Sequence, residues 1–394
     1  MTRRILLITL PAVFMLAVLC GSAFSQQKVK VVVKEKHEDR DLSGNMHYGR
    51  SGQEPGTWDA VIKGNEINIQ FYGKEWTDGR NFNVADFGTL PMDKFGEFSL
   101  TRDAGKMTLK GVFQDHWGHG TYKFEENTAF KSYLEQKGYS GLDEERMISV
   151  FTTDINKGYF DFMKENGYAQ ISNNQFKDLA EQDMSRKVLE EYFALFKTEG
   201  YGHQSLDKLV ELREHGVSAK YIGSIHAMGY KGFSLDKALE LCDHGVTAAY
   251  IAEVRKMAKG PVTLDQAESL QDHGVSSRYV ASLKKMDPNM TLEKAQELQD
   301  HGVSIGFINS LESMGYKNVS LDRAMELVDH GVSANFIKSI NDLGFKNLSL
   351  DKAEELVNHG VSADFIKKMK GKGIKLHTLD DYIRLSDTGF SDSD

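Results

Sequence analysis

The feature of this sequence that most constrains its fold is a repeat of about 29 residues. The pair His-Gly occurs at 215–216, 244–245, 273–274, 301–302, 330–331 and 359–360, in nearly equal steps. A fixed period in this range is typical of solenoids, in which each repeat is one supersecondary unit that packs on its neighbours. We therefore predict an array of stacked units in the second part of the chain.

Each unit carries the signals of two short helices. In the unit that begins at Ser320, this serine is a favourable N-cap, and Gly331 follows the first apolar stripe, where helices end in the left-handed conformation. Ser333 then starts a second helix, which Gly344 ends. The first-helix caps in successive units are Ser205, Ser234, Thr263, Thr291, Ser320 and Ser349. The second-helix caps are Ser218, Thr247, Ser276, Ser304, Ser333 and Ser362.

The array is predicted to begin before the first His-Gly pair. Gly-aromatic pairs start at 138, 167, 200 and 229, and the longer step from 167 to 200 predicts one hairpin with about one extra helical turn. We predict about eight units over residues 127–385, with "TLDDYIRLSDTGF" as a terminal half-unit cap. Residues 386–394 are predicted to form a frayed tail.

Residues 26–126 have the alternating pattern of an antiparallel β domain with five or six strands, the first at 28–34. Around Gly64-Asn65, a two-residue turn places Ile62 opposite Ile67 on an apolar face. The predicted fold is therefore an α+β chain in two parts, a small antiparallel β domain followed by an α-solenoid of helical hairpins.

A second hairpin is predicted to turn at Ala104-Gly105, which places Leu100 opposite Leu109. The next turn, in "QDHWGHGT", holds His116 and His119. Together with Asp115, these histidines could suggest a metal site. Zinc needs three or four converging ligands, and no helix aligns the two histidines here. We therefore interpret this segment as a turn with an aromatic tip.

Residues 1–25 have the features of a secretory signal peptide: Arg3 and Arg4, an apolar stretch, and a small-residue cleavage site before Gln26. The apolar stretch is shorter than the ~20 residues of a membrane span. A lipoprotein anchor at Cys20 is disfavoured because bulky Leu19 precedes it. We predict an exported protein, periplasmic or extracellular, with no membrane span after cleavage.

Cleavage would leave Cys242 as the one cysteine, so no internal disulfide is predicted. Equivalent positions in other repeats hold Arg213, Gln271, Gln299, Val328 and Val357. This tolerance indicates a partly exposed thiol without a catalytic role.

The charge and motif content argue against several function classes. The net charge of −9, with both signs well mixed, argues against a nucleic-acid partner. The chain has no His-Glu-x-x-His, no Gly-x-Ser-x-Gly, no phosphate loop and no dinucleotide fingerprint. We therefore predict no catalytic residues, no cofactor and no metal site.

The repeated histidines allow two interpretations: His215, His244, His273, His301, His330 and His359. One is a ladder of metal or proton sites along an edge of the array. The other is helix capping, because a histidine at a helix C-terminus bonds free carbonyls and suits the dipole. Packed helices lie about 8–10 Å apart, too far for two histidines to share one zinc ion, which favours capping.

Positions on the second helices that vary between repeats indicate a binding face, since solenoids offer extended surfaces to partners. Neutral drift at solvent-facing positions is the alternative. The predicted partner-binding residues are Lys220, Arg255, Arg278, Lys284, Asn335 and Asn341. The identity of the protein partner does not follow from the sequence.

The stretch "FSLTRDAGKMTLKGVFQDHWGHGTYKFEEN", followed by units of the form ELxDHGVSxxFI, resembles the exported C-terminal extensions of some bacterial antirepressor-type membrane zinc metallopeptidases of the penicillin-sensor kind. The resemblance covers roughly residues 58–385. It implies an exported, bacterial, two-part protein. The peptidase part and its zinc motif are absent here, so the resemblance implies no activity.

Together these patterns predict an exported, non-enzymatic protein-interaction or sensory scaffold of a bacterial envelope. A structural or adhesion spacer is the first alternative. A divergent enzyme with its site where the sheet meets the first repeat is the second.

Overall fold

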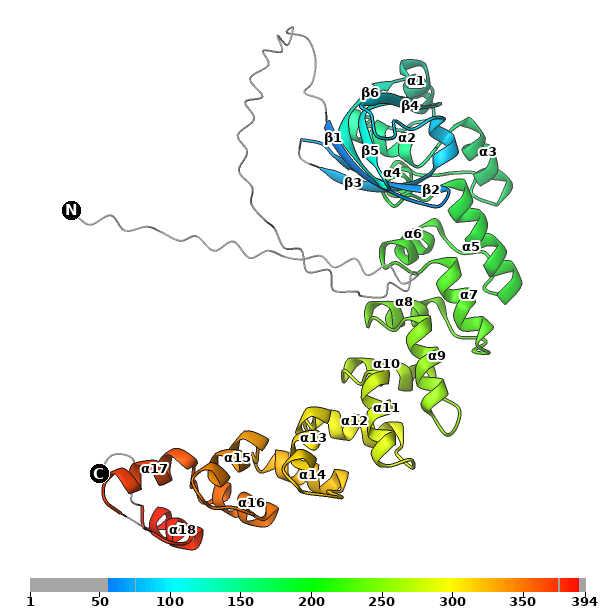
Figure 1. Ribbon diagram of the computed structural model, residues 1–394. Helices are drawn as coiled ribbons and strands as arrows, with labels where there is room; N and C mark the ends of the chain where they lie inside the picture. The colour runs from blue at the N-terminus through cyan, green and yellow to red at the C-terminus, as the bar shows by residue number, and fades with distance from the viewer. Residues whose placement is uncertain (1–55, 75, 375, 390–394) are drawn as a thin grey trace, which may run out of the picture. The chain divides into compact units, whose positions relative to one another are not determined.

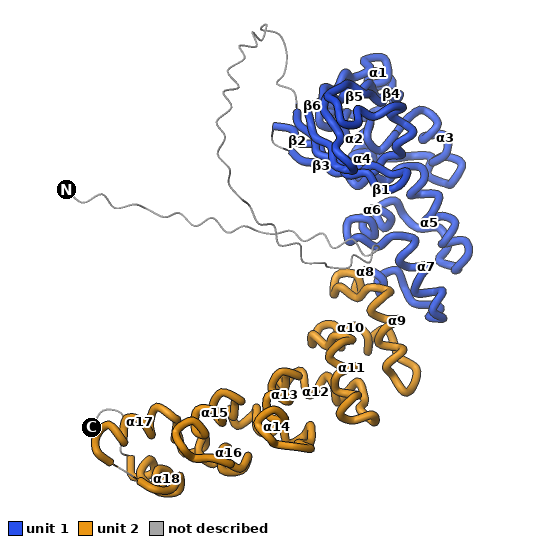
Figure 2. Tube along the Cα trace, in the orientation of Figure 1, with its two compact units in different colours: residues 1–239 blue, residues 240–394 orange. Residues whose placement is uncertain are grey.

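The computed structural model describes residues 56–74, 76–374 and 376–389. The predicted signal peptide, Cys20, the predicted strand at 28–34 and residues 390–394 lie outside the described residues. Two compact units divide the chain, residues 1–239 and residues 240–394 (Figure 2).

Unit 1 begins with one antiparallel sheet of six strands (Figure 1). The strands are β1 (Gly56–Lys63), β2 (Glu66–Tyr72), β3 (Thr77–Asn83), β4 (Gly96–Arg102), β5 (Gly105–Gln114) and β6 (Trp117–Glu126), in the spatial order β3-β2-β1-β6-β5-β4. A short 3₁₀ helix, η1 (Val84–Phe87), follows β3. Ile62 pairs with Ile67, as predicted from the Gly64-Asn65 turn. Trp58, Ile69 and Phe71 are buried on the inner face.

The predicted register of the second hairpin is wrong. Arg102 pairs with Gly105, so the turn is Asp103-Ala104, and Leu100 faces Met107 rather than Leu109. The reason lies in the neighbouring strand β6. A Cβ atom at Gly105 would stand 2.4 Å from the carbonyl oxygen of Glu125, so this glycine permits close strand pairing instead of forming the turn.

The rest of the described chain is a regular series of short helices. These are α1 (Thr128–Gln136), α2 (Glu144–Thr152), α3 (Lys157–Glu165), α4 (Asn173–Glu181), α5 (Arg186–Glu199), α6 (Leu206–Glu214), α7 (Ala219–Ala227), α8 (Leu235–Asp243), α9 (Ala248–Met257), α10 (Leu264–Asp272), α11 (Ser277–Met286), α12 (Leu292–Asp300), α13 (Ile305–Ser313), α14 (Leu321–Asp329), α15 (Ala334–Asp342), α16 (Leu350–Asn358), α17 (Ala363–Gly371) and α18 (Leu379–Asp387). The two-part α+β fold is thus confirmed.

The local signals behave as predicted. Every serine or threonine named above as a cap accepts a hydrogen bond from the backbone N–H three residues later. Gly331 and Gly344 have φ angles of 76° and 102° at helix ends. Helix α5 has 14 residues where most of the others have nine, which accounts for the one long step in the repeat.

In unit 2 the odd-numbered helices are the second helices of the hairpins, and each of α9, α11, α13, α15 and α17 contacts the next (Figure 1). One continuous core runs through the later repeats and includes Leu311, Ile340 and Tyr382. Each repeat therefore buries the apolar face of its neighbour, as a solenoid requires.

In unit 1 two arginines join the sheet to the first helices. The Arg102 guanidinium donates to the carbonyl oxygens of Phe151 and Thr152, at 2.6 and 2.7 Å. Arg80, which is 7% exposed, donates to the Thr152 hydroxyl and to the carbonyl oxygen of Ala180. Both cations thus bind carbonyl groups at helix C-terminal ends, where the helix dipole favours positive charge.

Unit 1 also contains a buried imidazole. His226 is 3% exposed, with Nδ1 3.0 Å from Oε2 of Glu199 and Nε2 2.8 Å from the hydroxyl oxygen of Tyr201. Lys231 also bonds Glu199, and the ring of Phe233 lies against the imidazole. Burial is the main cause that lowers the pKa of His226, with a smaller contribution from Lys231, and Glu199 opposes both.

Candidate functional site

The repeated histidines connect successive repeats. Each lies at the end of a first helix, as predicted, and the rings of five of them, from His244 onward, bond the repeat that follows. The Nδ1-to-Oδ1 distances are 2.6 Å for His244–Asp272, 2.5 Å for His273–Asp300, 2.7 Å for His301–Asp329, 3.1 Å for His330–Asn358 and 2.7 Å for His359–Asp387. We call these five pairs the histidine ladder.

The ladder follows from the spacing of the repeat. The acceptor is the last residue of the next first helix, directly before the next His-Gly position. Within one repeat, adjacent side chains on a helix point about 100° apart and do not meet. Between repeats, stacking brings the end of one first helix against the end of the next, so the pair forms across 27 or 28 residues.

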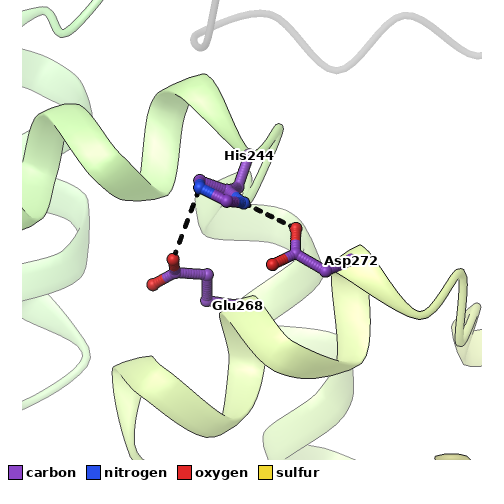
Figure 3. Close-up of side chains that lie close together, drawn as sticks. All are labelled: His244, Glu268 and Asp272. Carbon is purple, nitrogen blue, oxygen red and sulfur yellow. Dashed lines mark hydrogen bonds and ion pairs between the residues drawn. The ribbon is translucent and has the colours of Figure 1, made fainter.

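One pair of the ladder has a second carboxylate (Figure 3). Nε2 of His244 lies 3.7 Å from Oε1 of Glu268, while its Nδ1 bonds Asp272. The potential ligand atoms of these three residues lie within 4.8 Å of one another. Glu268 is buried, whereas the other two side chains are about two-fifths exposed. The hydrogen bond to Asp272 is the main cause that raises the pKa of His244.

One further pair of the ladder has a glutamate beside Nε2, with an asparagine in place of the aspartate. Nε2 of His330 lies 3.4 Å from Oε1 of Glu354, and Nδ1 bonds Asn358. Here Arg323 already donates to Glu354 at 2.7 Å. The residue equivalent to Glu268 in the other pairs is Gln296, Met325 or Ile383. A glutamate that faces Nε2 is therefore a property of two pairs and not of the repeat itself.

A second series of contacts joins the opposite ends of the first helices. In four of the first helices, a basic residue in the first turn bonds the acidic residue of the next first turn: Lys208–Asp236, Lys294–Asp322, Arg323–Asp351 and Lys352–Asp380. Among the second helices, tyrosine hydroxyls donate to valine carbonyl oxygens one repeat on: Tyr192–Val217, Tyr250–Val275 and Tyr279–Val303. The residues that recur in the repeat thus largely form contacts between successive repeats.

The predicted partner-binding residues fall into two groups. Lys220, Arg278 and Asn335 occupy one position, the second residue of α7, α11 and α15, and all are exposed. Each of the three stands on a different repeat.

The other predicted position lies near the end of the second helix. Arg255 is exposed, Asn341 is half-buried, and the Lys284 ammonium donates to the carbonyl oxygen of Met257. Lys370, at the same position, donates to the carbonyl oxygen of Leu343. Two lysines in this series thus bind the C-terminal end of the preceding second helix.

Two further sequence expectations have clear outcomes. Cys242 is 8% exposed, so the prediction of a partly exposed thiol is wrong. Gln271 and Val357 at the same position are half-buried. The turn of "QDHWGHGT" is confirmed, since Gln114 pairs with Trp117, and the Trp117 side chain is 65% exposed.

No protein-family model, curated protein or solved structure matches this chain. The resemblance to the exported extensions of membrane metallopeptidases therefore stays a prediction.

Proposed function

We propose that this chain is an exported, non-enzymatic scaffold of a bacterial envelope whose helical array binds a protein partner through the second residue of its second helices. One observation carries the proposal: in the six repeats that contain a His-Gly pair from residue 215 onward, this position is exposed and holds a different residue each time. Its occupants are Lys220 in unit 1 and Ala249, Arg278, Gly306, Asn335 and Asp364 in unit 2.

The contrast with the stacking contacts supports a binding role. Histidine, aspartate, tyrosine and capping serine recur because each stabilises the junction between repeats. The second residue of the second helix contributes little to that junction, so stacking does not restrict its residue type and the side chain is available to contact a partner. Chemically different side chains at regular intervals provide specificity along an extended surface.

Export is supported by the sequence of residues 1–25, which lies outside the described part of the chain. Among the residues that the structure describes, no helix combines the length and the apolarity of a membrane span. A non-enzymatic role is supported by the junction of sheet and first helices. There, Arg80 and Arg102 bind backbone carbonyl groups and a hydroxyl and form ion pairs with Asp78 and Asp154, so both cations are engaged in contacts within the fold.

A pull-down tests the proposal. The mature chain from Gln26, carrying a C-terminal tag, is incubated with envelope extract from the source cells, and bound proteins are quantified. We expect one stoichiometric partner that is lost in the double variant Arg278→Glu and Asn335→Arg. Lys123→Glu, a change at an exposed position on β6, is the matched control and should retain it.

The alternatives give different results. A spacer would bind no stoichiometric protein, and a partner retained by the double variant would bind elsewhere on the chain. Either result would overturn the proposed binding face.

A further inference from the structure

The two ring nitrogens of His244 have different partners, and this difference determines what the cluster can bind. Asp272 accepts a hydrogen bond from Nδ1–H at 2.6 Å, so the neutral imidazole carries its lone pair on Nε2. That lone pair belongs to the nitrogen that faces Glu268 at 3.7 Å. A carboxylate on the far nitrogen of a metal-binding histidine is the usual outer-shell arrangement in zinc sites.

We propose that His244 Nε2 and the Glu268 carboxylate bind a zinc ion, with Asp272 holding the imidazole in the required tautomer. Two ligand atoms that are each about 2.0–2.1 Å from one tetrahedral zinc ion lie roughly 3.3 Å apart. The observed separation of 3.7 Å reaches this value with a small side-chain movement. Two protein ligands are fewer than the three or four of structural and catalytic zinc sites, so water molecules fill the remaining coordination positions and we expect a weaker affinity than in those sites.

The donor set selects the ion. One imidazole nitrogen and one carboxylate oxygen suit zinc and its neighbours among the divalent transition metals, whereas calcium and magnesium prefer oxygen ligands alone. Glu268 is 8% exposed, and a buried carboxylate gains more from a bound cation than one in open water. Glu268 also has other contacts within the chain, and zinc has to compete with them.

The ladder contains its own comparison sites. His273 bonds Asp300 in the same way at 2.5 Å, but Gln296 replaces the carboxylate. His330 faces Glu354 at 3.4 Å, and the Arg323 guanidinium competes there for the carboxylate oxygens. We therefore expect the strongest site at His244, a weaker one at His330 and none at His273.

Isothermal titration calorimetry of the mature chain with zinc chloride at neutral pH tests the site. We expect His244→Ala to remove the strongest site, and Glu268→Gln to weaken it at least tenfold. Asp272→Asn should weaken it about 10- to 100-fold, the usual cost of losing an outer-shell partner. His273→Ala is the matched control and should leave the affinity unchanged.

A gain-of-site variant keeps the test independent of folding defects. Gln296→Glu supplies the missing carboxylate beside His273 and should add one zinc site per chain, with circular dichroism showing an unchanged helix content. A strongest zinc site of unchanged affinity in both His244→Ala and Glu268→Gln would overturn the proposal. No added site in Gln296→Glu, or equal losses from His273→Ala and His244→Ala, would overturn it as well. None of these outcomes depends on a protein partner.

Discussion

Replacing Tyr279 by phenylalanine would remove a single hydroxyl from the interior of the array. This hydroxyl donates to the carbonyl oxygen of Val303 at 2.6 Å, and the tyrosine is 8% exposed. Val303 lies between α12 and α13, so the bond joins one repeat to the next. Burial raises the pKa of Tyr279 to about 12, so the hydroxyl keeps its proton at neutral pH.

The expected cost follows from the burial of the bond. A buried neutral hydrogen bond contributes about 0.5–1.5 kcal/mol net, and a carbonyl left without its partner costs about 1–3 kcal/mol. We expect Tyr279→Phe to lower the free energy of unfolding of the surrounding repeats by about 1.5 kcal/mol. In the next repeat Phe307 and Val332 occupy the corresponding positions. Phe307→Tyr should therefore add a bond and stabilise that junction by about 0.5–1 kcal/mol.

Hydrogen–deuterium exchange resolved by peptide is the appropriate assay, because repeat arrays open locally and need not unfold in one step. The loss should be concentrated in peptides from α11 to α13, and the gain in peptides from α13 to α15. Equal protection in Tyr279→Phe and the wild type would refute the reasoning, since water would then replace the hydroxyl without cost. Destabilisation by Phe307→Tyr would refute the assumed equivalence of the repeats.

Two further predictions concern unit 1. Gly120→Ala places a Cβ atom 1.9 Å from the carbonyl oxygen of Lys110, so we expect a loss of about 3 kcal/mol in thermal unfolding. Gly223→Ala, whose Cβ atom would meet Leu195 Cδ1 at an ordinary 3.6 Å, is the milder control, and similar losses in the two variants would contradict the prediction. Because burial lowers the pKa of His226, the unfolded chain binds its proton more readily. Stability should then fall as the pH decreases below about 6.5, by at most about 1.4 kcal/mol per pH unit. In urea titrations, His226→Gln should flatten this dependence, and an unchanged slope would contradict it.

The sequence by itself determined the features that depend on neighbours in the chain. Capping bonds, helix-ending glycines and the long α5 all arise within a few residues, and the caps and glycines recur with the repeat. The register of the first hairpin also depends on nearby residues. Gly64 at φ 60° forms the turn, and the alternation of apolar residues in the two strands places Ile62 opposite Ile67.

Features that depend on a contact with another helix or strand were decided only by the tertiary structure. Gly105 was misread as a turn residue because β6, the strand that requires it, is distant in sequence. His244 was correctly placed at a helix end, yet its partners Asp272 and Glu268 belong to the following repeat. Helix spacing argued against two histidines that share an ion, whereas stacking brings the His244 imidazole within 3.7 Å of the Glu268 carboxylate. Which side chains meet across a stack depends on the rotation and offset of the helices, and short-range sequence signals do not encode either quantity.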